Sequence, residues 1–286
     1  MEEFHTKWMG RKRYHKAETV STNVDIRQLG EQGAEEGTIV SADVQTDGRG
    51  RRGRSWQTEA GTSLLFSVLL RPELVPDTAP QITLIMAMAV TKAIRYLTGL
   101  EPKIKWPNDV VVNNKKVCGI LTEMQLKNGG IDYVVVGTGV NVNQREIPEE
   151  LMQSATSLLL EKRRQFMAGQ QFMAEQQFVT GQQPAMEELG VAQLDREKLL
   201  AEIAEAFEDY YECFLQTKDL SYLMTKYNEW LVSRHKEVRV LDPKGEFTGI
   251  SKGINEKGEL LVELPNGEVT AIYAGEVSVR GLYGYV

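Results

Sequence analysis

The sequence predicts an α+β protein in which a mixed β-sheet packs with helices and a small all-β domain follows. Apolar runs typical of strands alternate with amphipathic or apolar helical segments as far as residue 234. Turn sequences join several of the expected strands directly, and this favours α+β over a regularly wound parallel sheet. From residue 235 onward, short strand-like runs and turns replace the helical patterns. We therefore expect two domains, 1–234 and 235–286.

The composition is that of an ordinary globular protein, because 42% of the 286 residues are hydrophobic and 26% are charged. The formal net charge is −7, without the broad basic surface that is typical of nucleic-acid binding. No apolar run is long enough to span a membrane, the N-terminus has no signal-peptide pattern, and the distant Cys118 and Cys213 make no disulfide framework. These features predict a cytoplasmic protein. The sequence shows no P-loop motif, no zinc-site spacing and no convincing Ser/His/Asp or Cys/His catalytic set.

The first expected elements surround an arginine-rich loop. Ser21 or Thr22 is a suitable N-cap for a helix, because apolar residues follow at near-helical spacing. Strands are expected over 38–44 and 63–70. Residues 80–98 are apolar nearly all round and therefore predict a buried helix.

Gly99 is expected to end that helix, and a hairpin follows it. The hairpin consists of strands at 109–112 and 117–125 around an Asn-rich turn at 113–116. A further strand at 133–143 ends in small and polar residues. The two helical segments at 195–217 and 219–231 then follow; the first has apolar and aromatic residues at spacings of three and four.

Residues 161–186 contain three copies of a six-residue motif that begins with Gln-Phe. A period of six matches neither a helix nor a strand. We interpret this segment as a tolerated insertion, either a duplicated loop or an extended helix. In the second domain, the expected strands form a compact barrel and cover 238–241, 247–250, 260–264 and 268–272.

The loop at 48–56 carries four arginines within six residues, separated by glycines and followed by a tryptophan. Arginines at this density need a counter-anion or full solvation. Glycines expose backbone N–H groups, and guanidinium groups suit phosphate and carboxylate. A solvated patch or a nucleic-acid or targeting signal is the alternative interpretation. The acidic chain and the position of the loop between two strands favour an anionic, nucleotide-like ligand.

The sequence Lys-Trp-Pro-Asn-Asp at 105–109 is a second candidate site. A turn accounts for its last three residues, but not for Lys105 or the tryptophan. Asn108 is suited to reading an adenine, and Asp109 to holding a magnesium ion. Lys116, beyond the expected hairpin turn, is either a solvated edge residue or a point charge beside a phosphate. Cys118 lies in an apolar run and is interpreted as a packing residue.

Together with Ser-Thr-Asn at 21–23, Gln45 and Gly-Thr-Gly-Val-Asn-Val-Asn at 137–143, these motifs stand in the order found in biotin–protein ligases. The resemblance extends from about residue 14 to the C-terminus and is interrupted by the repeat at 161–186. The sequence is most similar to the ligases of Gram-positive bacteria related to bacilli. This order of five motifs is a specific signature.

The resemblance implies a catalytic domain akin to class II aminoacyl-tRNA synthetase cores, followed by an SH3-like barrel. It implies that biotin and ATP, with Mg2+, give biotinyl-5′-AMP, from which biotin passes to a lysine of a biotin carboxyl carrier protein. That carrier would belong to acetyl-CoA carboxylase or pyruvate carboxylase. Many bacterial members begin with a DNA-binding helix-turn-helix, whereas the catalytic pattern starts almost at once here. Either the protein is a monofunctional enzyme, or an N-terminal DNA-binding module was removed from the sequence. The expectation is the monofunctional type, without membrane or nucleic-acid partners, and a homodimer remains open.

The resemblance also implies roles for particular residues. The catalytic candidates are Lys116, Arg51 and Lys105. The biotin-binding candidates are Ser21, Thr22, Asn23, Gln45, Gly48, Arg49, Lys116 and Gly119. The candidates for ATP and adenylate are Arg49, Arg51, Arg52, Arg54, Trp56, Asn108, Lys116 and Asn141, with Trp56 stacking on adenine. Asp109 is the candidate magnesium ligand.

Three alternatives remain at this stage. A lipoate–protein ligase or octanoyltransferase would share the catalytic architecture, although its pattern differs at the arginine loop and at 105–109. A regulator that binds biotinyl-AMP and represses DNA would need a DNA-binding module. An inactive paralogue would act only as a binding module, but no motif residue is broken.

Overall fold

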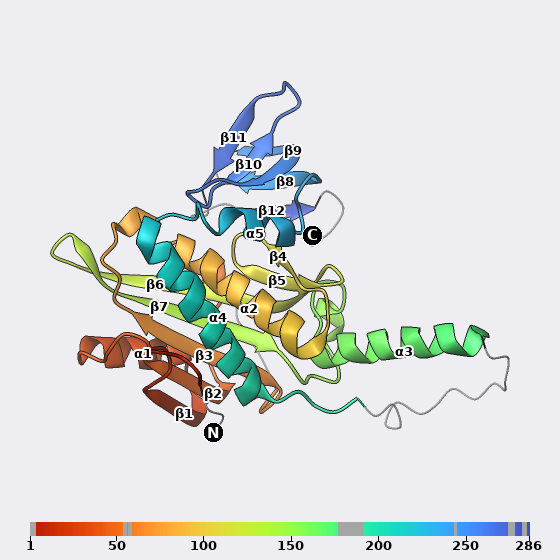
Figure 1. Ribbon diagram of the computed structural model, residues 1–286, viewed down its shortest axis with the longest axis horizontal. Coiled ribbons are helices and arrows are strands. Elements are labelled where there is room, and N and C mark those ends of the chain that lie inside the picture. Colours follow the sequence, from red (N-terminus) through yellow and green to blue (C-terminus); the bar gives the residue numbers. More distant parts are fainter. Residues whose placement is uncertain are drawn as a thin grey trace.

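The computed structural model describes residues 4–53, 56, 59–176, 191–242, 245–273, 278–281 and 285–286. Its larger part is a seven-stranded mixed sheet with the strand order β1-β2-β3-β7-β6-β5-β4 (Figure 1). Only β1 and β2 pair in parallel, and the other ladders are antiparallel. The strands are β1 (Arg13–Thr19), β2 (Ile39–Gln45), β3 (Ser63–Leu70), β4 (Lys103–Lys105), β5 (Asp109–Val112), β6 (Lys115–Lys127) and β7 (Gly130–Asn141).

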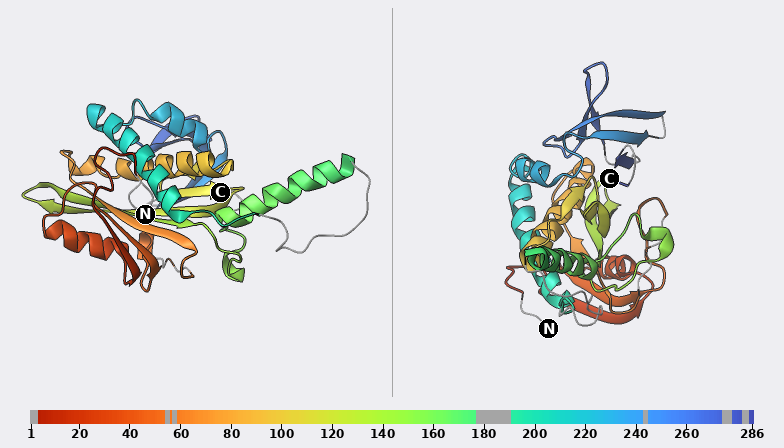
Figure 2. Two further views of the ribbon diagram at one scale, coloured as in Figure 1. Left: turned by 60° about the horizontal axis from the view of Figure 1, so that its bottom comes forward. Right: turned by 90° about the vertical axis from the view of Figure 1, so that its right-hand side faces the viewer.

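Helices cover both faces of this sheet. Helices α2 (Gln81–Thr98) and α4 (Arg196–Thr217) pack on each other and on one face, while α1 (Thr22–Glu31) packs on β2, β3 and β7 from the other face (Figure 2). The α1 helix covers only part of its face, so the rest remains available for a site. None of the described helices combines the length and the hydropathy that a membrane crossing requires.

Local sequence signals account for most helix ends. Ser21, in extended conformation, is the N-cap of α1. The strand expected at 63–70 is also present, as β3. Helix α2 ends at Gly99, whose φ of 67° is left-handed and favours glycine. The β5–β6 turn places Asn113 and Asn114 at φ 49° and 63°, a conformation that asparagine tolerates better than most residues.

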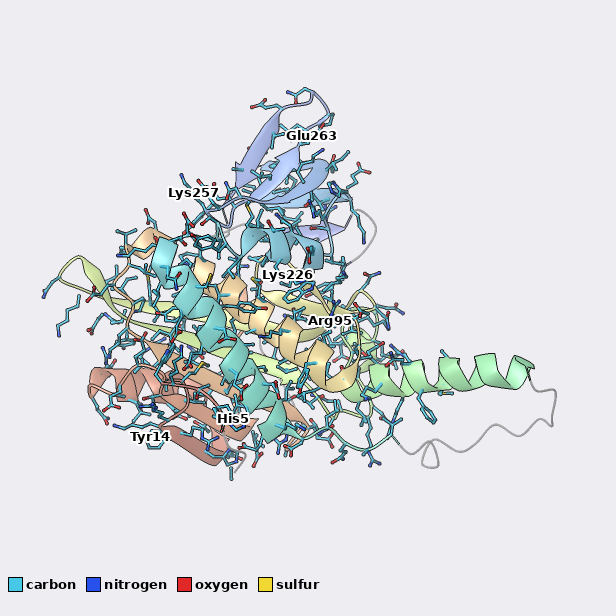
Figure 3. The ribbon with its side chains drawn as sticks, in the orientation of Figure 1. His5, Tyr14, Arg95, Lys226, Lys257 and Glu263 are labelled. Atoms are coloured by element: carbon cyan, nitrogen blue, oxygen red, sulfur yellow. The ribbon has the colours of Figure 1, made fainter. Side chains whose placement is uncertain are left out.

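Two strands of the main sheet, β1 and β4, were not predicted from the sequence. β1 is an edge strand of largely exposed polar residues, and Tyr14 lies on it at the outside of the molecule (Figure 3). β4 has only three residues. Neither strand has the apolar alternation on which a sequence-based prediction depends. β1 is a strand because it pairs in parallel with β2 after the α1 crossover.

The repeat segment is helical where the structure describes it. Helix α3 (Leu158–Gln176) includes the first two copies and extends away from the sheet (Figure 1), and the third copy, at 177–182, lies outside the described residues. The buried Glu161 anchors the first turn of α3, because it accepts hydrogen bonds from Asn113 Nδ2 at 2.7 Å and Thr156 Oγ1 at 2.6 Å. Of the two interpretations of the repeat, the extended helix fits this part.

The C-terminal strands form a five-stranded antiparallel sheet with the order β11-β10-β9-β8-β12. No ladder among the described residues joins β11 to β12. The expectation of a closed SH3-like barrel is therefore wrong for the described part, which is an open sheet. Helix α5 (Met224–Trp230) precedes this sheet. Its strands are β8 (Glu237–Asp242), β9 (Gly245–Ile254), β10 (Leu260–Glu263), β11 (Val269–Ile272) and β12 (Ser278–Gly281).

Trp106 joins the two sheets. Its side chain is only 2% exposed, and its indole N–H donates to the carbonyl of Gly258 at 3.0 Å. The turn at 107–109 does not explain why residue 106 is a tryptophan, whereas the contact of its indole with Gly258 does. Its role is therefore structural.

The N-terminal segment is fixed by one buried carboxylate. Glu208 of α4 accepts hydrogen bonds from the backbone N–H groups of Lys7, Trp8 and Met9 at 2.7, 2.9 and 2.9 Å. Glu208 is 4% exposed, so its removal leaves three donors without an acceptor in a site with little water. We expect Glu208→Ala to lower the free energy of unfolding by about 3 kcal/mol.

Urea unfolding measures that change, and hydrogen exchange at residues 7–9 locates it. Glu212→Ala on the same helix is the matched control, because the Glu212 carboxylate is 36% exposed and holds the Lys7 ammonium at the surface. It should have a much smaller effect. Equal stabilities of the two variants would contradict the anchoring role of Glu208.

Candidate functional site

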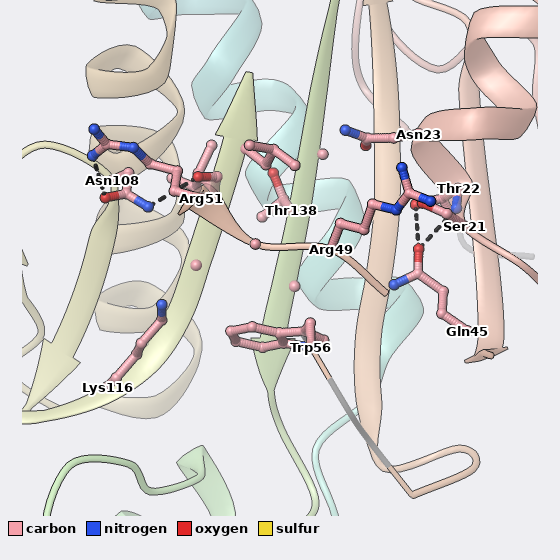
Figure 4. Close-up of a pocket in the computed structure, with 16 residues that line it drawn as sticks. Ser21, Thr22, Asn23, Gln45, Arg49, Arg51, Trp56, Asn108, Lys116 and Thr138 are labelled. Atoms are coloured by element: carbon pink, nitrogen blue, oxygen red, sulfur yellow. Dashed lines mark hydrogen bonds between the residues drawn. The ribbon is translucent and has the colours of Figure 1, made fainter. Parts of the chain in front are cut away.

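A pocket lies on the face of the main sheet that α1 leaves uncovered (Figure 4). Ten of the residues predicted for the site line it: Ser21, Thr22, Asn23, Gln45, Arg49, Arg51, Trp56, Asn108, Lys116 and Gly119. Six further lining residues were not among the predicted site residues: Gly50, Ile120, Leu121, Gly137, Thr138 and Gly139. The loop at 48–56, the start of α1 and strands β6 and β7 thus meet at one place.

The floor of the pocket consists of small residues on neighbouring strands. Gly119 of β6 is directly opposite Gly139 of β7 in the ladder, and Ser67 of β3 is opposite Gly137. The Trp56 ring lies over the first pair, since a Cβ on Gly139 would lie 2.7 Å from it and one on Gly119 2.9 Å. The glycines therefore make the space that the indole occupies.

Neutral polar groups form one end of the pocket. The Gln45 side-chain oxygen accepts hydrogen bonds from the backbone N–H and the hydroxyl of Thr22 at 2.8 and 3.0 Å. The hydroxyl of Ser67, which is fully buried, lies 2.7 Å from Thr22 Oγ1 and 2.6 Å from Asn23 Oδ1. Asn23 also donates to Glu123 at 2.7 Å. These bonds fix donors and acceptors in set directions before any ligand enters.

Cationic groups form the other end. Arg51 donates to Asn108 Oδ1 at 3.0 Å, and the Asn108 amide donates to the carbonyl of Ile120 at 3.1 Å. Lys116 Nζ lies 2.7 Å from the Asp109 carboxylate and 5.3 Å from the centre of the Trp56 ring. A charged head group is thus held beside an aromatic face.

Four predicted site residues do not line the pocket. Gly48 supports the loop, because its carbonyl accepts the N–H of Trp56 at 2.7 Å. Lys105 lies over the ring of Tyr285, and Asp109 lies behind Lys116. Asn141 donates to the carbonyl of Thr156 at 3.1 Å. Arg54 and the side chain of Arg52 lie outside the described residues.

The Asp109 carboxylate, the candidate magnesium ligand, has protein groups as its partners. Among the described residues there is no cluster of three His, Cys, Asp or Glu side chains that could hold a metal ion. Burial would raise the pKa of Asp109, but the charges of Lys116 and Lys105 and hydrogen bonds from Lys116 and Tyr285 outweigh it and lower this pKa below its ordinary value. The carboxylate is therefore engaged with protein groups. Burial also raises the pKa of the neighbouring Cys118 thiol, which fits a packing role.

A second cavity, of about 280 Å³, lies beyond the Arg51–Asn108 pair. Both residues line both cavities, as Ile120 and Leu121 do, so this pair is part of the wall between them. Apart from Arg51 and Asn108, the second cavity is lined mainly by apolar residues and threonines: Ala79, Pro80, Thr83, Pro107, Ile120, Leu121, Thr122 and Met124.

A serine, a histidine and an aspartate do meet outside the pocket. His15 of β1 lies 3.0 Å from Ser41 Oγ through Nδ1 and 3.2 Å from Asp43 Oδ2 through Nε2. Arg196 forms an ion pair with Asp43 at 2.9 Å. The set lies outside the residues that line either described cavity, and it connects β1, β2 and the start of α4.

Comparisons with known proteins point to one family. Residues 17–141 match the model of the biotin/lipoate A/B protein ligase family, and residues 236–280 match that of the biotin protein ligase C-terminal domain. The chain is 31% identical over 276 residues to the bifunctional ligase/repressor BirA of Bacillus spizizenii, covering 96% of this chain and 76% of that protein. It is 30% identical over 268 residues to the biotin–[acetyl-CoA-carboxylase] ligase of Mycobacterium tuberculosis, covering 91% and 86%.

A solved structure is also similar. The biotin protein ligase of Aquifex aeolicus in complex with biotin and ATP superimposes with a TM-score of 0.74 at 31% sequence identity. The match covers 95% of this chain and 99% of that one.

Proposed function

The chain belongs to the biotin protein ligase family, and from this premise we propose that it activates biotin with ATP and transfers it to a lysine of a carrier protein. One observation supports this function above the others: a neutral polar end and a cationic, aromatic end share one glycine-lined floor. Such a pocket suits an elongated ligand with a polar ring at one end, a negative charge in the middle and a base at the other end.

The neutral end is proposed to hold the biotin ring. The ureido group of biotin has two N–H donors and a carbonyl acceptor, and Ser21, Thr22 and Gln45 offer hydroxyl and amide groups of both kinds. Asn23 holds the start of α1 above Gly137. Gly48, Arg49 and Gly119 would shape the passage towards the carboxylate.

The cationic end is proposed to hold the nucleotide. Arg51 and Lys116 are placed to neutralise the carboxylate and the α-phosphate, with Arg49, Arg52 and Arg54 as further loop cations. Trp56 offers a face for the adenine, beside Asn108. Lys105 and Asn141 would act from behind the pocket, since their side chains contact Tyr285 and Thr156. Magnesium is proposed to enter with the phosphates of ATP rather than on Asp109.

The chemistry consists of an adenylyl transfer to biotin followed by an acyl transfer to the lysine. A biotin carboxylate oxygen attacks the α-phosphorus of ATP, and the bond to pyrophosphate breaks. The ε-amine of the acceptor lysine then attacks the acyl carbon, loses a proton and displaces AMP. Neither step needs a nucleophile from the protein, so catalysis depends on holding two anions together and on stabilising developing charge.

The acceptor is proposed to be the biotin carboxyl carrier domain of acetyl-CoA carboxylase or pyruvate carboxylase. The relative from M. tuberculosis carries the first of these in its name. We also propose a division into domains 1–234 and 235–286, which the start of β8 at Glu237 supports. Residence in the cytoplasm is consistent with the free thiols of Cys118 and Cys213.

Exchange of labelled pyrophosphate into ATP tests the first step, with biotin, lipoate and octanoate as parallel acids. Exchange with biotin alone is expected. Exchange with lipoate or octanoate instead would transfer the protein to the lipoate branch of the family. No exchange with any acid, from folded protein with magnesium present, would contradict the proposed function.

The close approach of Asn23 to β7 gives a prediction for biotin binding. A Cβ on Gly137 would lie 2.0 Å from Asn23 Oδ1, so Gly137→Ala must displace Asn23 from its hydrogen bonds. We expect the Kd for biotin to rise at least about tenfold. Isothermal titration calorimetry measures it. Gly130→Ala on the same strand is the control, because its nearest neighbour would be 4.0 Å away. An unchanged Kd for Gly137→Ala would remove Asn23 from the biotin site.

A further inference from the structure

The end of the chain reaches back to the lysine of the pocket. The hydroxyl of Tyr285, the last residue but one, donates a hydrogen bond to Asp109 Oδ2. The other carboxylate oxygen, Oδ1, holds Lys116 Nζ at 2.7 Å. Tyr285 and Lys116 therefore contact one oxygen of Asp109 each, and together they fix the orientation of the carboxylate.

A second cation contacts the same tyrosine. Lys105 Nζ lies 3.8 Å from the centre of the Tyr285 ring, in cation–π geometry. The Asp109 carboxylate, with 11% of its side chain exposed, is thus near two ammonium groups on β4 and β6. The neighbouring Cys118 stays neutral as a thiol. The tyrosine is the one member of this group that comes from beyond the C-terminal sheet.

We propose that Tyr285 is a positioning residue for adenylate formation: by holding Asp109, it fixes the ammonium of Lys116 where the carboxylate meets the α-phosphate. This inference rests on the proposed function. Tyr285 itself does not line the pocket. It acts through Asp109, from a position beyond the C-terminal sheet.

Two substitutions separate the contributions of the tyrosine. Tyr285→Phe keeps the ring over Lys105 and removes the hydroxyl, so Asp109 Oδ2 loses its donor while buried. The Lys116 ammonium would then be held less firmly. The chemical step should therefore slow, while substrate binding should stay nearly unchanged. We expect kcat for adenylate formation to fall about tenfold with little change in KM for biotin. Tyr285→Ala, which also removes the ring, should be slower still.

The pH profile gives a readout that a purely structural role would not change. The hydrogen bond from Tyr285, with the charges of Lys116 and Lys105, lowers the pKa of Asp109. The Asp109–Lys116 ion pair is therefore lost as pH falls through that pKa. Without the hydroxyl this pKa rises, so in Tyr285→Phe the acidic limb of the kcat profile should move to higher pH.

The experiment compares wild type, Tyr285→Phe and Tyr273→Phe in single-turnover adenylate formation between about pH 3 and pH 9, a range that extends below the ordinary pKa of an aspartate. Tyr273 is the matched control, since it belongs to the same C-terminal part and is 50% exposed. Its variant should behave as wild type. Wild-type kcat and an unshifted profile in Tyr285→Phe would overturn the proposal.

A second measurement does not depend on activity. Carbon-13 NMR of the side-chain carboxyl gives the pKa of Asp109 in wild type and in Tyr285→Phe. An unchanged pKa would also overturn the inference, even if the protein proved inactive with biotin. Inactivity of the wild type with every acid would instead count against the proposed function, so the two failures are distinguishable.

Discussion

Replacing Lys116 by alanine is expected to slow biotinyl-5′-AMP formation by two to three orders of magnitude. The ammonium lies between the Asp109 carboxylate and the Trp56 ring, at the cationic end of the pocket. A charge held there is already oriented when negative charge develops on the transferring oxygens. Loss of one such oriented donor typically costs about 3–4 kcal/mol of transition-state stabilisation.

Single-turnover kinetics with biotin and ATP measure this loss. Lys115→Ala is the matched control, because Lys115 precedes Lys116 on β6 and its ammonium donates to the carbonyl of Met152, away from the pocket. That variant should retain its rate. A loss below tenfold in Lys116→Ala would reduce Lys116 to a bystander and would transfer the charge-stabilising role to the loop arginines.

Replacing Arg51 by glycine is expected to release the adenylate before it reaches the acceptor lysine. Arg51 donates to Asn108, and the pair is part of the wall between the pocket and the second cavity. Without the guanidinium this wall opens and the phosphate loses a cation. Removal of a charged hydrogen-bonding partner weakens binding by about 1.5–3 kcal/mol, so we expect the adenylate to dissociate about 10–100 times faster. The released mixed anhydride then acylates amines on unrelated proteins.

Retention of labelled adenylate on gel filtration and biotin labelling of added bovine serum albumin test this prediction together. Arg145→Gly provides the control, since Arg145 is exposed in the segment after β7 and lines neither cavity. Full retention of the adenylate without stray labelling would show that Arg51 does not close the site.

Local sequence signals predicted those parts of the fold that local physics determines. An apolar run with a glycine behind it gives α2 and its end at Gly99, and an Asn-rich turn gives the β5–β6 hairpin. β1 could not be predicted in this way, because its residues are polar and exposed and it is a strand only by its pairing with β2. The closed barrel was wrong for the described part because whether the first and last strands meet depends on long-range geometry.

The same division applies to the site. Residues with unusual chemistry, such as Lys116, Arg51 and Trp56, were predicted from the sequence and line the pocket. The floor was predicted only in part: Gly119 was a candidate, whereas Gly137 and Gly139 were not, because they matter through their positions opposite Ser67 and Gly119 in the ladders. A run of alternating small residues on β7 was the available signal. Tyr285 had no signal at all, since its partner Asp109 is 176 residues away.

The glycine-lined floor has a consequence for altering what the enzyme accepts. Peptide groups of β6 and β7 form this surface, and their positions are fixed by ladder hydrogen bonds rather than by rotamers. Libraries that vary Gly119, Gly137 or Gly139 should therefore yield mostly inactive clones. Libraries at Arg49 and Gln45 can change side-chain length without moving a strand. The pocket should thus tolerate substitutions best at Arg49 and Gln45, and a ligase for a modified biotin is best sought at these positions.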